Sequence, residues 1–339
     1  MKISSMRQVS KGVRLQRFRD AAAKASAKCG KSAGSLFWDL LWCSYKYGAG
    51  PTDYLMCEFY NMNASERATF LTRVRSAAFV KRVNPRDMSY IFNDKNEFAK
   101  RFGDLMHRDT IKVEGMDADA FRRFLEGKDA VIAKPVDGDC GTGIEKLYVT
   151  NFADENAMYE YIKRADKRFG ILEEVVRQHP DAARLHPDSI NCVRVATFVK
   201  DGEPHVVYSA VKFGTGGTPC DNTGRGGITC MYDLDNGVIC GQGHDEELNK
   251  YNFHPTTGIK LIGCRLPMAK EVKELALTAA MRYPAFKYVG WDIAMAENGP
   301  CIIEGNDYPG YDLAQMPDDN MPHPWHGLIS CFEKLGVEV

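Results

Sequence analysis

Hydrophobic and polar positions alternate over Tyr288–Asn306, which predicts two short strands joined by a Glu-Asn-Gly-Pro turn. The oxygen-bearing side chains that converge in this predicted hairpin are Asp292, Glu304 and Asn306. Opposed side chains of neighbouring strands lie close enough to act on one ion, and oxygen ligands suit Mg²⁺. The hairpin therefore predicts a divalent-metal site. The alternative is an ordinary hairpin with acids on its solvent face.

A helical periodicity dominates the first 90 residues. Within residues 35–48 the apolar side chains recur at i, i+3, i+4 and i+7, namely at Trp38, Leu41, Trp42 and Tyr45. Such a stripe usually belongs to a core, and a surface that faces a membrane or a partner is the alternative. Because 53–59 and 64–83 continue the pattern, we expect residues 1–90 to form a helical N-terminal region.

A lysine at the end of a predicted strand, Lys134, precedes a glycine-rich loop with Gly138, Gly141 and Gly143. Three glycines in six residues let a loop fold tightly, with its N–H groups pointing at an anion. The lysine precedes the glycines, so this is not a Walker P-loop. We expect a cover over phosphate groups, with a purely structural turn as the alternative.

Three later segments carry further candidate residues. The strand at 170–176 contains Glu173 and Glu174, which point to opposite faces, so one of them is expected at a ribose or an adenine and the other at the surface. Arg194 lies mid-strand among apolar residues, where it binds an anion or forms a structural ion pair. The strand that contains Arg194 is followed by an Asp-Gly turn and a second strand that pairs with it, and Lys212 ends this second strand.

Six glycines occur within residues 214–227, too many for an ordinary connection. The segment is typical of a mobile flap over an active site. Asn222 and Arg225 are its candidate functional side chains.

Charge and composition narrow the class of protein. The net charge of −1 over 339 residues argues against a nucleic-acid binder, yet residues 1–31 carry nine Lys and Arg against one Asp. Such a basic arm suits an anionic membrane surface or a phosphate-bearing partner, with a solvated helix as the alternative. The eleven scattered cysteines have no zinc spacing and indicate free thiols in a reducing cytoplasm. We expect no signal peptide and no membrane-spanning segment.

The order of these features resembles the ATP-grasp superfamily: strand-Lys-Pro with a glycine loop, a Leu-Glu-Glu strand, a paired-strand lysine, an Asn-x-x-Arg-Gly-Gly flap, and Asp followed by Glu-x-Asn. The most similar group is the sugar-transfer-associated ATP-grasp proteins, related to the alpha-L-glutamate ligase-like group. Asn93-Asp94-Lys95-x-x-Phe98 and Ser189-Ile190-Asn191-x-x-Arg194-Val195 also resemble this group. The resemblance covers about residues 45–335.

The resemblance implies an α+β ATP-grasp fold, in which subdomains 91–176 and 177–339 sandwich ATP after the helical region 1–90. It implies ATP contacts from Lys95, Lys134, Lys212, Gly138, Gly141, Gly143, Glu173, Glu174, the backbone near Val176, and Asn222. It implies two Mg²⁺ ions, or Mn²⁺, at Asp292, Glu304 and Asn306. Arg225 matches the arginine that steadies the acyl phosphate in ribosomal-protein glutamate ligases. Gly290 stands where D-alanine–D-alanine ligases have an arginine.

These expectations favour an ATP-dependent carboxylate–amine ligase that works through an acyl phosphate, with Arg194, Arg225 and Lys212 as catalytic residues. Its substrates are expected to be small molecules, a carboxylate and an amine, and the modified compound a sugar, an amino acid or a cell-surface polymer precursor. The alternatives are a phosphotransferase that acts on a hydroxyl and a nucleotide-binding module without turnover. The expected location is the cytoplasm or, through the basic arm, the inner membrane surface. The oligomeric state stays open.

Overall fold

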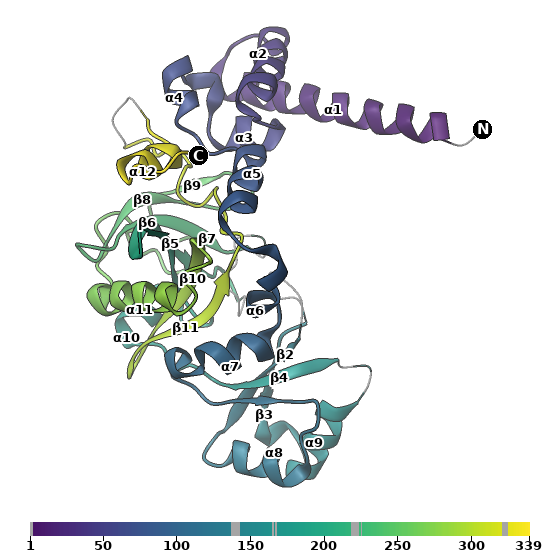
Figure 1. Cartoon of the computed structure of the whole chain (residues 1–339), viewed down its shortest axis with the longest axis vertical. Coiled ribbons are helices and arrows are strands. Elements are labelled where there is room, and N and C mark those ends of the chain that lie inside the picture. The colour runs from purple at the N-terminus through teal and green to yellow at the C-terminus, as the bar shows by residue number, and fades with distance from the viewer. Residues whose placement is uncertain are drawn as a thin grey trace. The chain divides into compact units, whose positions relative to one another are not determined.

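The computed structural model describes residues 3–136, 143–164, 166, 168–217, 224, 226–320 and 325–339, with the backbone only for residues 3–14. The chain divides into two compact units (Figure 1). One unit consists of residues 1–82 and 310–339, and the other of residues 83–309. The subdomain limits predicted from the sequence, 91–176 and 177–339, stay a prediction.

The first unit is helical in the residues described. Its helices are α1 (Ile3–Cys29), α2 (Ala33–Tyr47), α3 (Pro51–Met56), a 3₁₀ turn (Phe59–Asn61), α4 (Ala64–Ala68), α5 (Arg73–Val83, whose last residue belongs to the second unit) and α12 (Leu328–Lys334). The predicted helical N-terminal region is thus confirmed, although 53–59 and 64–83 are shorter helices separated by breaks. None of the helices described is both long and apolar enough to cross a membrane.

The aromatic stripe of α2 is not part of a core, which corrects the favoured sequence interpretation. Trp38, Trp42 and Tyr45 are exposed, and Leu41 is only partly buried. The buried face of α2 is instead made by Leu36, Leu40, Cys43 and Tyr47. Both the buried and the exposed face of α2 carry residues at helical spacing. The two tryptophans, Trp38 and Trp42, lie on the exposed face.

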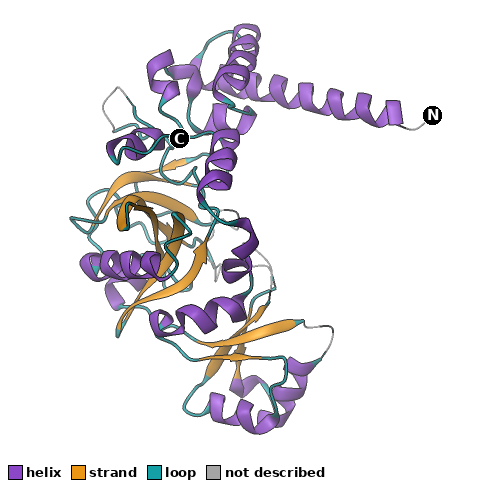
Figure 2. Cartoon of the chain, in the orientation of Figure 1, coloured by secondary structure: helices purple, strands orange, loops and turns teal. Residues whose placement is uncertain are grey.

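The second unit contains two antiparallel sheets in its described residues (Figure 2). The smaller has the order β1-β4-β2-β3, with strands β1 (Thr110–Lys112), β2 (Ala130–Pro135), β3 (Glu145–Tyr148) and β4 (Phe169–Glu174). Two helices, α8 (Ala118–Leu125) and α9 (Glu155–Lys163), supply side chains to its core. Phe121 of α8 and Met158 of α9 are fully buried there. Strands β2 and β4 pair directly in this sheet, and Lys134 lies near the end of β2.

The larger sheet has the order β11-β10-β5-β6-β7-β8-β9. Its strands are β5 (Cys192–Lys200), β6 (Glu203–Phe213), β7 (Ile228–Asp233), β8 (Val238–His244), β9 (Lys250–Tyr251), β10 (Tyr288–Ala296) and β11 (Gly299–Asn306). The turn between β5 and β6 has positive φ at Asp201 and Gly202, as the predicted tight hairpin requires. The predicted hairpin at 288–306 is likewise confirmed, and together with the helices these sheets confirm the α+β prediction.

Strand alternation gives the larger sheet two different faces. Trp291 and Ile293 of β10 lie in the main core with side chains of the helices α7 (Lys95–Met106) and α11 (Ala269–Arg282). Because side chains alternate along a strand, the side chain of Asp292 points to the opposite face of the sheet from Trp291 and Ile293. The remaining short helices of this unit are α6 (Tyr90–Asn93) and α10 (Pro180–Ala183). The polar face of β5, β6, β10 and β11 is therefore the one on which to look for chemistry.

Candidate active site

The predicted metal ligands and Arg194 lie in a row across neighbouring strands. Asp292 on β10 faces Glu304 on β11 to one side and Arg194 on β5 to the other. Asn306, two residues beyond Glu304, faces Gly290, so it shares the same side of the sheet. The structure thus brings Asp292, Glu304 and Asn306 together, as the hairpin pattern predicts.

Asp292 is buried between two cations. Arg194 donates to its two carboxylate oxygens from Nε and from Nη2, the latter at 2.8 Å, and Lys212 donates from Nζ at 2.8 Å. Burial raises the pKa of Asp292, but the charges of Arg194 and Lys212 outweigh burial and hold the pKa well below its usual range. Asp292 is therefore ionised and compensates two buried positive charges.

The sequence leaves open whether Arg194 binds an anion or forms a structural ion pair. In the structure it forms an ion pair with Asp292. Its Nη1 forms no hydrogen bond to any residue that the structure describes. It lies against Gly290, where an added Cβ would be 3.6 Å from Nη1 and 3.2 Å from Cδ of Arg194. The small residue at 290 gives the guanidinium its place on the sheet.

Glu304 and Asn306 complete the polar row. Desolvation by the surrounding protein raises the pKa of Glu304, and the charge of Asp292 adds to the rise. Asn306 approaches Glu304 with its Nδ2 at 3.5 Å from Oε1. Glu304 thus adds a second carboxylate to a site where Asp292 already faces two cations.

The donor set fits a hard divalent cation. The three candidate ligands are two carboxylates, Asp292 and Glu304, and one amide, Asn306. Among the described residues, no cluster of three or more His, Cys, Asp or Glu side chains could hold a metal ion. Oxygen donors suit Mg²⁺ or Mn²⁺, while zinc prefers nitrogen and sulfur. A cation here would relieve the repulsion between Asp292 and Glu304.

A cavity of about 420 Å³ joins this row to the smaller sheet. Six predicted site residues line it, namely Lys95, Lys134, Glu173, Arg194, Glu304 and Asn306. Lys95 opens α7 directly after the cap Asp94, and its backbone N–H donates to Val136 at the end of β2. Two lysines and Arg194 therefore share one cavity with three acids, Glu173, Glu304 and Asp307.

Glu173 is fixed by two cations, one of which the sequence analysis missed. Arg108 donates from Nε to Glu173 at 2.8 Å, and Lys134 donates from Nζ at 2.9 Å. Burial raises the pKa of Glu173, but Arg108 and Lys134 outweigh it and lower the pKa to about 2. Arg108 also donates to the carbonyl oxygens of Ile302, at 2.6 Å, and Ile303, at 3.2 Å, so it ties β4 to β11. Glu173 is occupied by these partners.

The other predicted residues lie apart from this cavity or outside the description. Glu174 accepts from the backbone N–H of Asp109 at 3.1 Å, and Val176 packs against a small cluster around Cys192. Gly143 has φ +75°, which favours glycine. Gly138, Gly141, Asn222 and Arg225 lie outside the described residues.

The first residues of the glycine-rich segment 214–227 rest on a buried polar network. Gly214 donates its N–H to Ser189 Oγ at 3.1 Å, and its carbonyl oxygen lies 2.9 Å from His254 Nε2. His186 Nε2 lies 2.9 Å from the carbonyl oxygen of Gly216, and its Nδ1 lies 2.8 Å from Ser189 Oγ. The base of this segment, at Gly214 and Gly216, is thus held in place by buried side chains.

Gly214→Ala is expected to break this network. An added Cβ would lie 2.6 Å from Ser189 Oγ and 2.7 Å from His186 Nδ1, so those side chains must move. We expect a loss of about 1–3 kcal/mol in the free energy of unfolding, measured by urea denaturation. Gly217→Ala, where an added Cβ would have no described residue within 4 Å, is the control and should be neutral. Equal stability of the two variants would contradict a tightly packed base.

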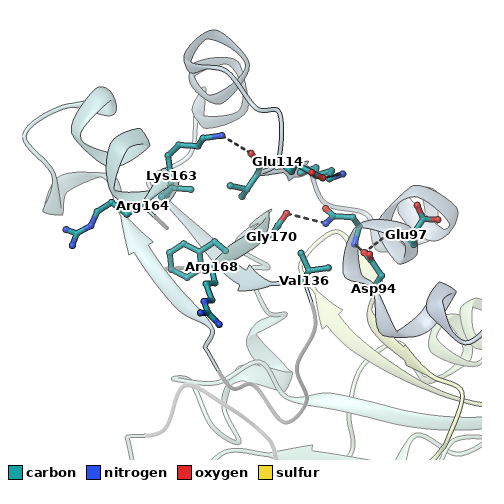
Figure 3. Close-up of a pocket in the computed structure, with 13 residues that line it drawn as sticks. Asp94, Glu97, Glu114, Val136, Lys163, Arg164, Arg168 and Gly170 are labelled. Atoms are coloured by element: carbon teal, nitrogen blue, oxygen red, sulfur yellow. Dashed lines mark hydrogen bonds and ion pairs between the residues drawn. The ribbon is translucent and has the colours of Figure 1, made fainter. Parts of the chain in front are cut away.

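A second cavity, of about 500 Å³, lies beside the smaller sheet and contains none of the predicted site residues (Figure 3). Its polar groups connect elements of the fold: Asn96 donates to the carbonyl of Gly170 at 3.3 Å, and Lys163 donates to the carbonyl of Val113 at 3.2 Å. Asp94 accepts from the first turn of α7. These contacts connect α7 to β4 and α9 to the residue that follows β1.

Comparison with known proteins agrees with this arrangement. A family model described as sugar-transfer associated ATP-grasp matches residues 74–323. A search of curated proteins finds no match.

Among solved structures, the chain is similar to D-cycloserine synthetase DcsG, with 12% identity over 78% of each chain and a TM-score of 0.43. It is also similar to the ATP-grasp ligase PsnB in complex with a minimal precursor, with 17% identity over 73% of this chain and 63% of that chain and a TM-score of 0.40. A third similar structure is the D-alanine-D-alanine ligase from Coxiella burnetii, with 11% identity over 73% of this chain and 53% of that chain and a TM-score of 0.38. The match thus spans less than two thirds of PsnB, and these distant similarities assign no activity.

The family model, by contrast, covers well over half of the sequence, including the strands that carry Lys134, Arg194, Asp292 and Glu304. The chain therefore belongs to the sugar-transfer-associated ATP-grasp family, which confirms the predicted α+β ATP-grasp fold.

Proposed function

We propose that the protein is an ATP-dependent carboxylate–amine ligase that works through an acyl phosphate. The observation that carries the proposal is the cavity that Lys95 and Lys134 line together with Glu304 and Asn306. Cations on one side and metal-type oxygen donors on the other suit a polyphosphate with its divalent ion. Family membership supports ATP as the nucleotide.

The proposed roles follow from the contacts. Lys95 and Lys134 neutralise phosphate charge, and Lys212 and Arg194 hold Asp292 ionised and correctly oriented. Arg194, which lines the cavity, is proposed to bind an oxyanion through Nη1. Asp292, Glu304 and Asn306 would hold Mg²⁺, which when bound neutralises charge on the transferring phosphoryl group. We keep the flap residues Asn222 and Arg225 as proposed ligands of the same site.

In the proposed reaction the substrate carboxylate attacks the terminal phosphorus of ATP, and ADP leaves. An amine then attacks the acyl carbon, and inorganic phosphate leaves as the C–N bond forms. Two steps of this kind need no protein nucleophile, because positioning and electrostatics supply most of the rate. The buried pairs around Asp292 and Glu173 support this because they hold the cationic side chains rigidly.

Hydroxylamine tests the acyl phosphate. The protein is incubated with ATP, Mg²⁺ and pools of amino acids or uronic acids, and ADP release is measured with and without hydroxylamine. A ligase should convert the carboxylate to a hydroxamate, because hydroxylamine replaces the amine. A stable phosphate ester without hydroxamate would overturn the proposal in favour of a phosphotransferase. No ADP release in any pool, with ATP bound, would favour a module without turnover.

We also propose where the enzyme works. The acceptor is a sugar, an amino acid or a cell-surface polymer precursor, and the basic arm at residues 1–31 holds the enzyme at the inner membrane surface. The exposed lysines and arginines that α1 contributes support this, among them Arg17, Arg19, Lys24 and Lys28.

A further inference from the structure

The first unit displays an aromatic face that the catalytic proposal does not use. Trp38, Trp42 and Tyr45 lie at i, i+4 and i+7 of α2, with 71%, 53% and 85% of their surface exposed. Neighbouring Trp42 and Tyr45 rings are 6.0 Å apart. Large aromatic side chains are normally the first to be buried, so a row of three in solvent indicates a surface that another molecule covers.

Apolar surface continues beside this aromatic face of α2. Val74, at the start of α5, is 63% exposed, and its Cβ lies 3.0 Å from the position of an added Cβ at Gly48. A cavity of about 460 Å³ runs between the end of α2 and the start of α5, and Tyr45 and Val74 both line it. The exposed apolar patch therefore extends over two helices of the same unit.

The charged side chains around the aromatic face are mostly basic. Lys46 lies 5.8 Å from the centroid of the Trp42 ring, and Arg73 and Arg75 line the adjoining cavity. Lys24 and Lys28 add exposed positive charge to the same unit, on α1.

The acids close to this face are occupied inside the protein. Asp39 of α2 accepts two bonds from Arg67 at 2.8 Å and one from Tyr54 Oη at 2.7 Å. Asp53 is buried and accepts from the backbone N–H of Gly50 and from Tyr311 Oη, both at 2.8 Å. The charge that an approaching molecule meets is therefore positive.

The geometry points to an anionic lipid surface as the occupant: we propose that the aromatic face of α2 inserts among lipid headgroups while the surrounding lysines and arginines bind lipid phosphates. Trp and Tyr carry an apolar ring with a polar tip and prefer the boundary between water and hydrocarbon. Side chains that protrude from a helix with flanking cations suit such a boundary.

This inference extends the proposed membrane association from the basic arm to α2, and it rests on that part of the proposed function. It does not depend on the ligase chemistry. Vesicle binding and ATP turnover are separate measurements, so either proposal can fail while the other stands.

The test is cosedimentation of the full chain with vesicles. Vesicles of phosphatidylcholine with about 30 mol% phosphatidylglycerol should bind the protein, and pure phosphatidylcholine should bind it weakly, because each basic residue near the surface contributes about fivefold in affinity. The emission of Trp38 and Trp42 should shift to shorter wavelength on binding.

The triple variant Trp38→Ala/Trp42→Ala/Tyr45→Ala separates this face from the basic arm. Since the three side chains are exposed, the variant should fold, and its binding to the anionic vesicles should fall by about tenfold or more. Phe253→Ala, at a 57% exposed position of the second unit, is the matched control and should bind like the unchanged protein.

Lys46→Glu/Arg73→Glu, at two exposed cations beside the aromatic face, tests the electrostatic part. The double exchange should weaken binding to anionic vesicles and leave binding to phosphatidylcholine as it is. Unchanged binding of the triple aromatic variant would overturn the proposal. Self-association that the aromatic exchange abolishes, without vesicle binding, would overturn it in favour of a contact between two copies of the chain.

Discussion

Glu304→Gln is expected to abolish ATP turnover in a protein that stays folded. The amide keeps the size of the side chain but removes one of the two charges that would bind the metal, so we expect a loss of at least ~100-fold in turnover. Desolvation of its carboxyl group and the charge of Asp292 both raise the pKa of Glu304, so its charge is unfavourable in the fold and removing it should not lower the melting temperature. ADP release and thermal unfolding are measured on the same preparation.

Asp292→Asn should differ from Glu304→Gln in its effect on stability. It leaves Arg194 and Lys212 buried without their shared counter-charge, which costs about 3–5 kcal/mol in the free energy of unfolding. Turnover should fall as well. Glu297→Gln, an exposed acid in the turn of the same hairpin, is the control and should change neither property. Normal turnover in both the Glu304 and the Asp292 variants would remove our assignment of the metal ligands.

Arg108→Ala is expected to give the second large effect, through stability and through the position of Lys134. The side chain joins Glu173 of β4 to two carbonyl groups of β11, and both partners of the ion pair are buried. Removing it leaves a buried carboxylate with one cation, so we expect a loss of about 3–5 kcal/mol in urea unfolding and a higher KM for ATP. Arg282→Ala, whose partner Asp104 is exposed, is the control and should cost no more than about 1 kcal/mol.

The pH dependence of stability distinguishes the ion pair of Arg108 from its carbonyl contacts. Because the pKa of Glu173 is lowered to about 2 in the folded chain, its ionisation stabilises the fold above about pH 4.5, and this contribution of about 3 kcal/mol is lost as the pH falls toward 2. In Arg108→Ala that pKa should rise. The stability difference between the two proteins should therefore shrink between pH 5 and pH 3. A difference that does not change with pH would contradict the ion pair as its cause.

Local patterns were sufficient to predict the polar row of the hairpin. Alternation with period two places Asp292 on the face opposite Trp291, and a short turn makes β11 the neighbour of β10. Once the two strands pair, Glu304 must face Asp292 or its neighbours. The same reasoning identified Lys134 as the residue at the end of a strand before a glycine loop.

The aromatic stripe of α2 shows what periodicity leaves undecided. Spacing of i, i+3, i+4 and i+7 states that Trp38, Trp42 and Tyr45 share a face, but it does not state whether anything covers that face. Leu36 and Leu40 mark a second apolar face, and contact with α1 and α3 decides which face is buried. The expectation that an apolar stripe of helical period belongs to a core is therefore wrong for this face of α2.

By itself, the sequence determined the helical N-terminal region, the hairpins and the residues that share each strand face, because these depend on neighbours a few positions apart. The tertiary structure decided which charges meet. Arg108 pairs with Glu173, 65 residues away, and Arg194 pairs with Asp292, 98 residues away. No local pattern encodes such pairs, since a buried charge needs a partner that only the packing of one strand against another can bring.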